Sequence, residues 1–230
     1  DTVEVGQKYY EAGVPRPNLL LIMLKSLSNM QFHTLLPDLS ALLARRGYTH
    51  FTRYSAVGRP NSKANEAALY LGEALGSRSI PWQHNRTWLW DELRRADYAT
   101  LKAEDGCGHE SQAPVRSRIA HGKQLAKLFC LQSGRPNCIG NRSTAGILLD
   151  YTSQFIRAYS DMSAPWAAFI SFVEGREDSL TAAAALDSLL CTFFAKEATT
   201  LEQNTIIVLT SDQGLEYGPY ALTEAGRKER

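Results

Sequence analysis

The sequence predicts an α/β protein with a doubly wound, mostly parallel sheet. Two observations favour this class. Segments whose apolar residues have helical spacing alternate with apolar runs of strand length, and several of those runs are apolar at nearly every position, as in strands buried on both faces. The 230 residues, 44% of them hydrophobic, are enough for one sizeable core, so we expect 1–230 to form a single domain.

The first elements are a strand, a helix and a second strand. "NLLLIML" at 18–24 is a continuous apolar run, which predicts a buried strand. Leucines at helical spacing predict a short helix over 36–47, with Asp38 or Ser40 placed to accept a backbone amide near its start. "YTHFTRYSAV" at 48–57 alternates between apolar and polar residues, and we expect it to form the second strand.

Two helices and a strand follow. Ala, Leu and Glu dominate 61–76, and Asn61 or Ser62 is placed to cap this predicted helix. The amphipathic segment 88–98 predicts another helix, and "YATLKAEDG" at 98–106 predicts a strand that ends in an acidic turn. The tryptophans in and before the second of these helices are expected to be packing residues.

The later part of the chain returns to regular alternation after an irregular stretch. Residues 106–140 are rich in Gly, Ser, Pro, Arg and Cys without a sustained period, which predicts a long excursion and not a second domain. Beyond it the pattern predicts a helix at 145–161, a strand at 165–175, a helix at 180–198 and a strand at 204–214.

In such a sheet, ligands bind in a crevice beyond the carboxyl ends of the strands. The polar residues at these ends are Lys25, Glu104, Asp105, Glu174 and the segment 211–213. We expect the three acidic residues to lie in solvated turns. Lys25 is unusual, because a strong apolar strand delivers a cation to the place where an α/β enzyme usually keeps a working carboxylate.

Charge and hydropathy argue against two classes of partner. Lys and Arg number 25 against 24 Asp and Glu, and the formal charge of +1 gives no reason to expect nucleic acid or an anionic membrane as partner. No apolar run approaches the roughly 20 residues that span a bilayer. The first residues lack the basic-then-apolar order of a signal peptide, so we expect a mature or trimmed start.

Cysteines and glycosylation acceptors favour a secreted or luminal protein. Asn85 and Asn141 each begin an Asn-x-Ser/Thr acceptor, and the chain has four cysteines. Cys130 and Cys138 can close a small loop. Four cysteines permit three pairings, of which we expect Cys130 with Cys138.

Five segments in order resemble a known superfamily. They are "LIMLKSLSNMQFHTLLP", "YSAVGRPNSKANEAALYLGE", "ADYATLKAEDG", "CIGNRSTAGILLDYTSQFIRAY" and "TIIVLTSDQGLEYG". They resemble the alkaline phosphatase superfamily, specifically its sulfatase-like family of animal extracellular proteins of unknown function. The resemblance implies the front portion of an alkaline-phosphatase-like sheet, incomplete at its C-terminal end. It also implies hydrolysis of phosphate or sulfate esters by a hydroxyl nucleophile and divalent cations held by Asp and His.

The implied functional positions are largely replaced. The strand-end Asp of the family falls on Lys25, and the Thr nucleophile falls on Ser62, which we expect to be a helix cap more readily than a nucleophile. The family's "S-D-H-G" is here "SDQG", so Asp212 remains while Gln213 replaces a histidine. An upstream "H-D" pair falls on Glu177-Asp178.

We therefore expect no catalytic metal and no cofactor. A dication beside the Lys25 ammonium would cost several kcal/mol. The hypothesis is that Lys25 replaces the cation, with its ammonium near Asp212. The alternative is that Lys25 extends along the strand end to solvent.

The predicted function is that of a pseudoenzyme with a binding or structural role, whose partner is another protein or the remaining part of the same domain. One alternative is an active metal-dependent phosphoric or sulfuric ester hydrolase, in which Ser62 is the nucleophile and Asp212 and Asp178 hold one magnesium or manganese ion. A third alternative is a structural subunit of a larger extracellular assembly.

Overall fold

The computed structural model describes most of the chain outside the N-terminal segment and several loops. The residues that it describes are 16–52, 54–56, 62–72, 87–105, 121–124, 138–177, 179–215 and 218–229. Asn85, Cys130 and Asp178, three positions singled out in the sequence, lie outside these ranges.

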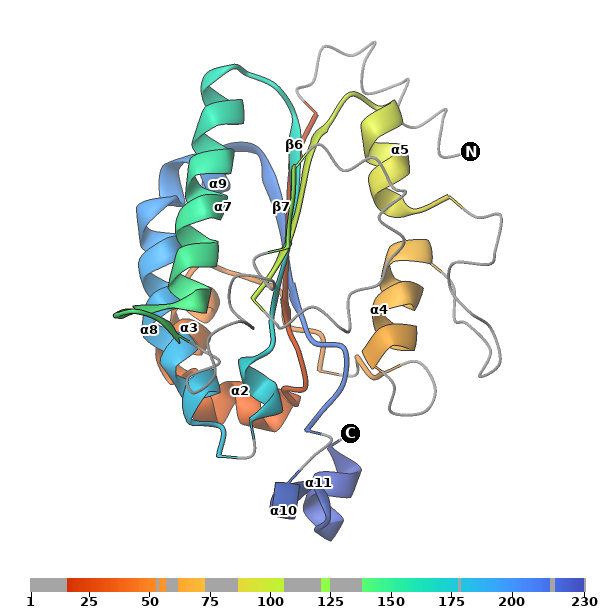
Figure 1. Ribbon diagram of the computed structural model, residues 1–230, viewed down its shortest axis with the longest axis vertical. Helices are drawn as coiled ribbons and strands as arrows, with labels where there is room; N and C mark the ends of the chain where they lie inside the picture. Colours follow the sequence, from red (N-terminus) through yellow and green to blue (C-terminus); the bar gives the residue numbers. More distant parts are fainter. Residues whose placement is uncertain are drawn as a thin grey trace.

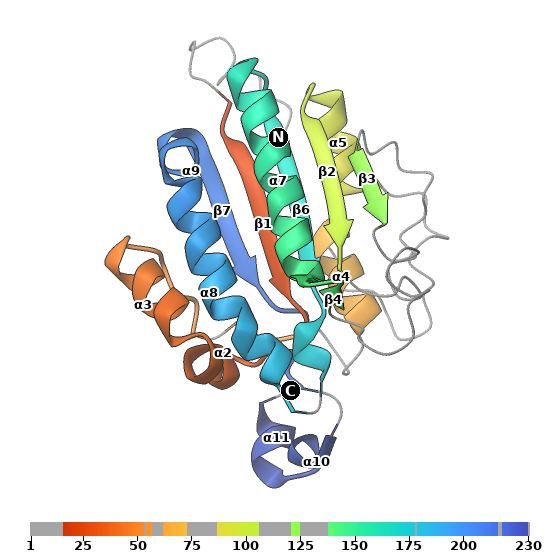
Figure 2. The ribbon, with the colours of Figure 1, turned by 60° about the vertical axis from the view of Figure 1, so that its left-hand side comes forward.

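A five-stranded parallel sheet forms the centre of the molecule (Figures 1 and 2). Its middle strands are β1 (Asn18–Leu24) and β6 (Trp166–Phe172), which pair in register. β7 (Thr205–Thr210) lies outside β1, while β2 (Ala99–Glu104) and then β3 (His121–Gln124) lie outside β6. The mostly parallel sheet of the predicted α/β class is confirmed.

β1 and β6 are central because their sequences are apolar on both faces. All seven residues of β6 are buried, as are the last five of β1. A strand flanked by strands on both edges and by helices on both faces has no position for a solvated side chain, and this is what a continuous apolar run provides. The predicted strands at 18–24 and 165–175 are confirmed by these elements.

Helices of the later part of the chain cover one face of the sheet (Figure 1). They are α7 (Thr144–Asp161), α8 (Thr181–Lys196) and α9 (Ala198–Asn204), and α2 (Asn29–Leu35) and α3 (Pro37–Arg45) pack against α8. The larger hydrophobic core fills the space between these helices and the sheet. The sequence did not predict α2 as a separate helix.

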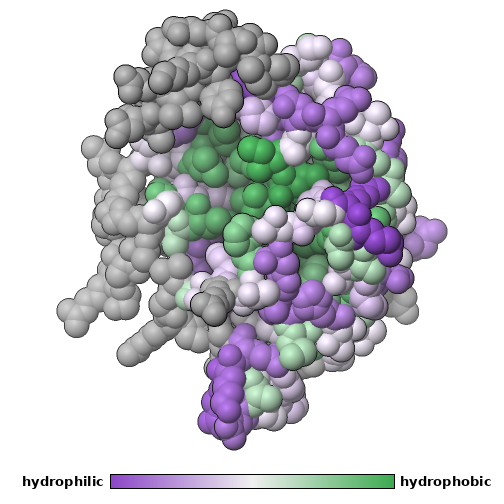
Figure 3. All heavy atoms as spheres, turned by 180° about the vertical axis from the view of Figure 1, so that it is seen from behind, coloured by the Kyte–Doolittle hydropathy of each residue, from purple (hydrophilic) through white to green (hydrophobic). Residues whose placement is uncertain are grey.

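The opposite face is covered by α4 (Ser62–Leu71) and α5 (Leu89–Arg95) over a smaller aromatic core (Figure 1). Both helices were predicted, although α4 ends earlier than 61–76, because Gly72 adopts a left-handed φ of 68° that breaks the helix. Figure 3 views the molecule from behind and shows an apolar area bordered by hydrophilic residues.

Two local predictions are wrong. At its described positions, segment 48–57 contains no strand, and Phe51 and Tyr54 are largely exposed, because its alternation has no sheet against which to bury one side. At the start of α3, neither Asp38 nor Ser40 acts as the cap. The backbone amides of Asp38 and Leu39 instead donate to the carboxylate of Asp187 in α8.

The predicted excursion at 106–140 includes described pieces of regular structure. Besides β3, the short β4 (Cys138–Ile139) pairs with β5 (Arg142–Ser143) in an antiparallel ladder. Cys138 is a free thiol in the structure, so it does not form the disulfide with Cys130 that the sequence predicted. It lies opposite Ser143 in the ladder, and Cys130 lies outside the described residues.

Candidate functional site

The candidate site lies at the edge of the sheet where the parallel strands end. Lys25 follows β1, Glu104 is the last residue of β2 and Asp212 follows β7. Glu174 begins the short 3₁₀ helix η2 (Glu174–Arg176) after β6. Because parallel strands end at the same edge, residues that are far apart in the sequence come together here.

Lys25 is fully buried and is held by two glutamates. Its exposure is 0%, and its Nζ lies 2.7 Å from Oε1 of Glu104 in β2 and 3.0 Å from Oε2 of Glu66 in α4. The alternative that Lys25 extends to solvent is therefore wrong. The sequence led us to expect this ammonium near Asp212, whereas the carboxylates that bind it are those of Glu66 and Glu104.

Lys102 adds a second cation to this group. Its Nζ lies 3.3 Å from Oε1 of Glu66 and about 5 Å from the ring centroids of Tyr70 and Trp90, which places it over both rings. Trp90 is stacked on Trp88, and both are buried, which confirms these two as packing residues, while Trp82 lies outside the described residues. We call Lys25, Glu66, Lys102 and Glu104 the Lys25 network.

The opposite charges of the network keep its lysine and glutamate side chains ionised, as the pKa shifts of Lys25 and Glu66 show. Burial acts to lower the pKa of Lys25, but Glu66 and Glu104 outweigh burial, so this pKa is raised. Burial acts to raise the pKa of Glu66, but Lys25 and Lys102 outweigh it and hold this pKa below its usual value. At neutral pH, Lys25 is therefore an ammonium group and Glu66 a carboxylate.

Asp212 holds the turn after β1 in place. Its Oδ1 accepts a hydrogen bond of 2.8 Å from the backbone N–H of Ser26, and its Oδ2 lies 3.8 Å from a guanidinium nitrogen of Arg176. Gln213, the next residue, is also buried. The surviving carboxylate of the family pattern thus binds a backbone amide and faces an arginine.

The backbone at Lys25 and Ser26 is tightly packed. Ser26 is fully buried with a left-handed φ of 60°, a conformation that is uncommon for residues other than glycine. Gly175 of η2 lies directly against the backbone of Lys25, since a Cβ atom at Gly175 would be 2.3 Å from the carbonyl oxygen of Lys25. The absence of a side chain at Gly175 therefore allows η2 to close over the end of β1.

Asp105 and Glu174 form a buried carboxyl pair beside the network. We expected both in solvated turns, but they are 3% and 5% exposed, because the turns after β2 and β6 pack together. Oδ1 of Asp105 accepts from the N–H of Val173, and the two carboxyl groups can hydrogen bond to each other only while one is protonated. Burial, reinforced by Glu174, raises the pKa of Asp105 well above its usual value, and burial also raises the pKa of Glu174.

Replacement of Asp105 by asparagine is expected to stabilise the protein increasingly as the pH rises. Because the pKa of Asp105 is raised in the folded state, the carboxyl pair contributes fully to the stability of the protein below the unfolded-state pKa of about 4. This contribution is lost as the pH rises through the folded-state pKa. The amide keeps the hydrogen bond to Glu174 without a shared proton. Urea unfolding between pH 4 and 8 will measure this as a gap between variant and native protein that widens with pH. The exposed Asp161→Asn is the control, and a constant gap for Asp105→Asn would contradict the shared proton.

Two further predicted positions can be located on their elements. Ser62 is the first residue of α4, the helix that carries Glu66, and Asn141 lies exposed in the turn between β4 and β5. Sequence reasoning missed Glu66 and Lys102. The only signal for Glu66 was that it is the single acidic residue of the helical segment 62–71.

The position between the two glutamates of the Lys25 network does not fit a divalent cation. The position between Glu66 and Glu104 holds the Lys25 ammonium, and at an effective dielectric constant of about 20 a dication about 4 Å from it would be repelled by about 8 kcal/mol. Among the described residues, no group of three or more His, Cys, Asp or Glu side chains is placed to hold a metal ion.

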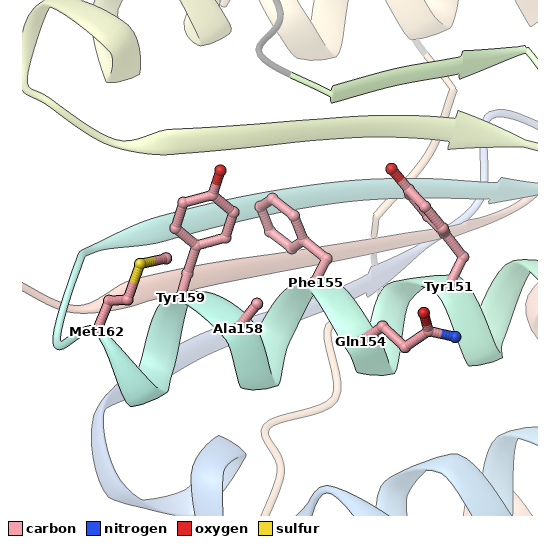
Figure 4. A pocket seen from close by; sticks show the side chains of 6 residues that line it. All are labelled: Tyr151, Gln154, Phe155, Ala158, Tyr159 and Met162. Carbon is pink, nitrogen blue, oxygen red and sulfur yellow. The ribbon is translucent and has the colours of Figure 1, made fainter.

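A shallow groove lies away from this edge of the sheet. It measures about 250 Å³ and runs along α7, where three aromatic rings line it on one side of the helix (Figure 4). Gln154 supplies its only side-chain amide. The residues that line it are Tyr151, Gln154, Phe155, Ala158, Tyr159 and Met162.

Comparison with protein families gives one match. The model described as "Protein of unknown function (DUF229)" matches residues 4–112 and 119–230. A comparison with curated proteins finds no significant match. Within the described part of the chain, no helix combines the length and hydrophobicity needed to cross a membrane.

Three solved structures of bacterial proteins have a similar fold. The lipoteichoic acid synthase LtaP from Listeria monocytogenes matches 93% of this chain and 60% of its own, with 15% identity and a TM-score of 0.62. A protein in the alkaline phosphatase superfamily from Vibrio parahaemolyticus matches 86% and 55%, with 17% identity and a TM-score of 0.65. The zinc complex of the C-terminal periplasmic domain of EptC from Escherichia coli matches 89% and 65%, with 13% identity and a TM-score of 0.58. The chain thus has an alkaline-phosphatase-like fold and spans less than two thirds of each of these proteins.

Proposed function

The chain belongs to the DUF229 family, and from its alkaline-phosphatase-like fold and the Lys25 network we propose that it is a pseudoenzyme. In this proposal it is a catalytically degenerate relative of sulfatases and phosphatases with a binding or structural role. The observation that carries the proposal is the burial of the Lys25 ammonium between Glu66 and Glu104.

The charge balance of the network supports this proposal. Two lysines and two glutamates compensate one another, and a buried carboxylate that is already paired gains little from a metal. A hydroxyl group is a poor nucleophile at neutral pH unless a base, a metal or another charge activates it. In this proposal, the Lys25 ammonium stands where the superfamily that the chain resembles has a metal-binding carboxylate. Ser62 therefore lacks the divalent cation that activates the nucleophile in that superfamily.

The contacts of Asp212 also support the proposal of a pseudoenzyme. Its carboxylate accepts from the Ser26 amide and faces the Arg176 guanidinium, so it stabilises the turn after β1. A role in maintaining the fold explains why this carboxylate remains although its neighbour is Gln213.

We further propose that the protein is secreted or luminal and carries a glycan at Asn141. The exposure of this residue in a turn supports the second part, because an acceptor must be reached by the transferase. The glycan at Asn85 and the protein partner remain predictions from the sequence.

Metal binding and ester hydrolysis test the pseudoenzyme directly. We expect the purified protein to contain no stoichiometric metal by elemental analysis and to show no heat of binding with Zn²⁺ or Mn²⁺ in calorimetry. Aryl phosphate and aryl sulfate turnover is expected to be the same in the native protein and in Ser62→Ala. One metal ion per chain, or turnover that Ser62→Ala abolishes, would establish the active hydrolase instead.

A further inference from the structure

The groove along α7 presents aromatic side chains at the surface of the molecule. Phe155 is buried, Tyr151 and Tyr159 are half-buried, and Met162 at the end of the helix is 62% exposed. The ring centroids of Phe155 and Tyr159 are 4.9 Å apart, and Figure 4 shows all three rings on the same side of the helix. A surface of this kind is suited to a ligand that has an apolar face.

The lining of the groove favours an uncharged ligand. None of its six residues is charged, and the exposed side-chain amide of Gln154 both donates and accepts hydrogen bonds. A sugar ring combines an apolar face of C–H groups with a rim of hydroxyl groups. The apolar face stacks on an aromatic ring, while the rim forms hydrogen bonds with an amide or a phenolic hydroxyl group. The groove therefore fits carbohydrate.

The small size of the groove favours a ligand that is tethered to the protein. Its volume of about 250 Å³ lies below the roughly 300–1,000 Å³ of typical small-molecule pockets, so a free sugar would bury little of its surface there. A covalently attached sugar is held at an effective concentration of about the millimolar range. Contacts that are too weak to capture a free ligand are then sufficient.

An attachment point for such a ligand lies at the start of α7. Asn141 is exposed in the turn between β4 and β5, just before the helix begins. The next residue, Arg142, forms an ion pair with Asp150 of α7, and Gln154 lies one turn beyond Asp150 on the same face of the helix. The hairpin is thus held against α7 at the Tyr151 end of the groove, and Figure 2 shows β4 beside this end of the helix.

We propose that the glycan on Asn141 folds back along α7 and packs in this groove, with its first sugars against the ring of Tyr151. This inference rests on the proposed glycosylation of Asn141. The first sugars of an N-linked glycan, N-acetylglucosamine and mannose, are uncharged, as the lining of the groove requires. The packed glycan covers the aromatic surface and ties the β4–β5 hairpin to the helix.

A double-mutant cycle between the acceptor and the groove tests the proposal. The chain is secreted from a eukaryotic host, and the mass of the glycopeptide shows whether Asn141 is modified. We expect Asn141→Gln to lower the Tm by about 2 to 4 °C, but to have almost no effect when Tyr151→Ser is already present. Tyr54→Ser, which alters an exposed tyrosine outside the groove, is the control and should leave the effect of Asn141→Gln unchanged.

Nuclear magnetic resonance reports the contact directly. Protons that lie over the face of an aromatic ring resonate upfield of their usual positions. We expect this shift for the first sugars on Asn141 in the native glycoprotein and its loss in Tyr151→Ser, whereas Tyr54→Ser should retain it. A purely structural effect of the Tyr151 substitution would not move the resonances of a sugar that extends into solvent.

Three results would overturn the proposal. A glycan on Asn141 whose removal has the same effect with and without Tyr151→Ser would disprove the packing while leaving the glycosylation intact. An unmodified Asn141 would disprove both. A rise in the Tm of Asn141→Gln on addition of a free N-acetylglucosamine oligosaccharide at micromolar concentration would instead make external carbohydrate the ligand of this groove.

Discussion

Replacement of Lys25 by methionine is expected to lower the free energy of unfolding by about 3 to 5 kcal/mol. The substitution keeps much of the side-chain volume but removes the ammonium, so Glu104 loses its buried partner and Glu66 is left with Lys102 alone. Urea unfolding at neutral pH, followed by the fluorescence of the buried tryptophans, measures the loss.

A surface pair provides the control for this substitution. Lys228→Met removes an exposed i,i+4 pair with Glu224 in α11 and is expected to cost no more than about 0.5 kcal/mol. Glu66→Gln and Glu104→Gln added to Lys25→Met should recover part of the stability, because neutral amides do not need the cation. If Lys25→Met costs no more than the surface control, the network does not stabilise the fold as described.

Replacement of Gly175 by alanine is expected to cost about 3 kcal/mol. The added Cβ would lie 2.3 Å from the Lys25 carbonyl oxygen, which is a backbone atom and cannot rotate away. Either η2 or the turn after β1 has to move, and the movement will disturb the contacts of Asp105, Ser26 and Asp212. The same unfolding measurement gives the cost, and hydrogen exchange at Ser26 reports the loosening of its bond to Asp212.

Gly226→Ala is a matched control for this clash. Its Cβ would lie 2.2 Å from the carbonyl oxygen of Tyr220, but it is in α11, outside the sheet and its cores. We expect faster exchange in α10 (Gly218–Ala221) and α11 with little change in the global unfolding midpoint. An equal global cost for the two substitutions would show that the packing at Lys25 is not special.

The sequence predicted those elements whose hydrophobic pattern directly matches their burial in the fold. β1 and β6 are apolar throughout because they are covered throughout, and the parallel arrangement then required the residues after the strands to meet at one edge. The strand predicted at 48–57 is absent at its described positions. Alternation of apolar and polar residues shows that one face of a segment is apolar, but it does not show that a sheet lies beside the segment to bury that face.

Tertiary packing decided the parts of the site that the sequence did not predict. The cation at Lys25 was singled out by its place after a strong strand, but its partners depend on how α4 lies across the sheet, and no local pattern encodes this. The burial of Asp105 and Glu174 likewise depends on two turns, after β2 and β6, that meet only in the folded protein. In both cases the residue types were visible in the sequence and their environments were not.

The sheet order also has a kinetic consequence. β1 pairs with β6 and β7, and a bond such as that from Ser26 to Asp212 joins residues 186 positions apart. During synthesis β1 emerges from the ribosome well before β6 and β7, and it stays apolar and unpaired until both of those strands have been made. Slow folding and a need for chaperones that shield nascent strands follow from this topology.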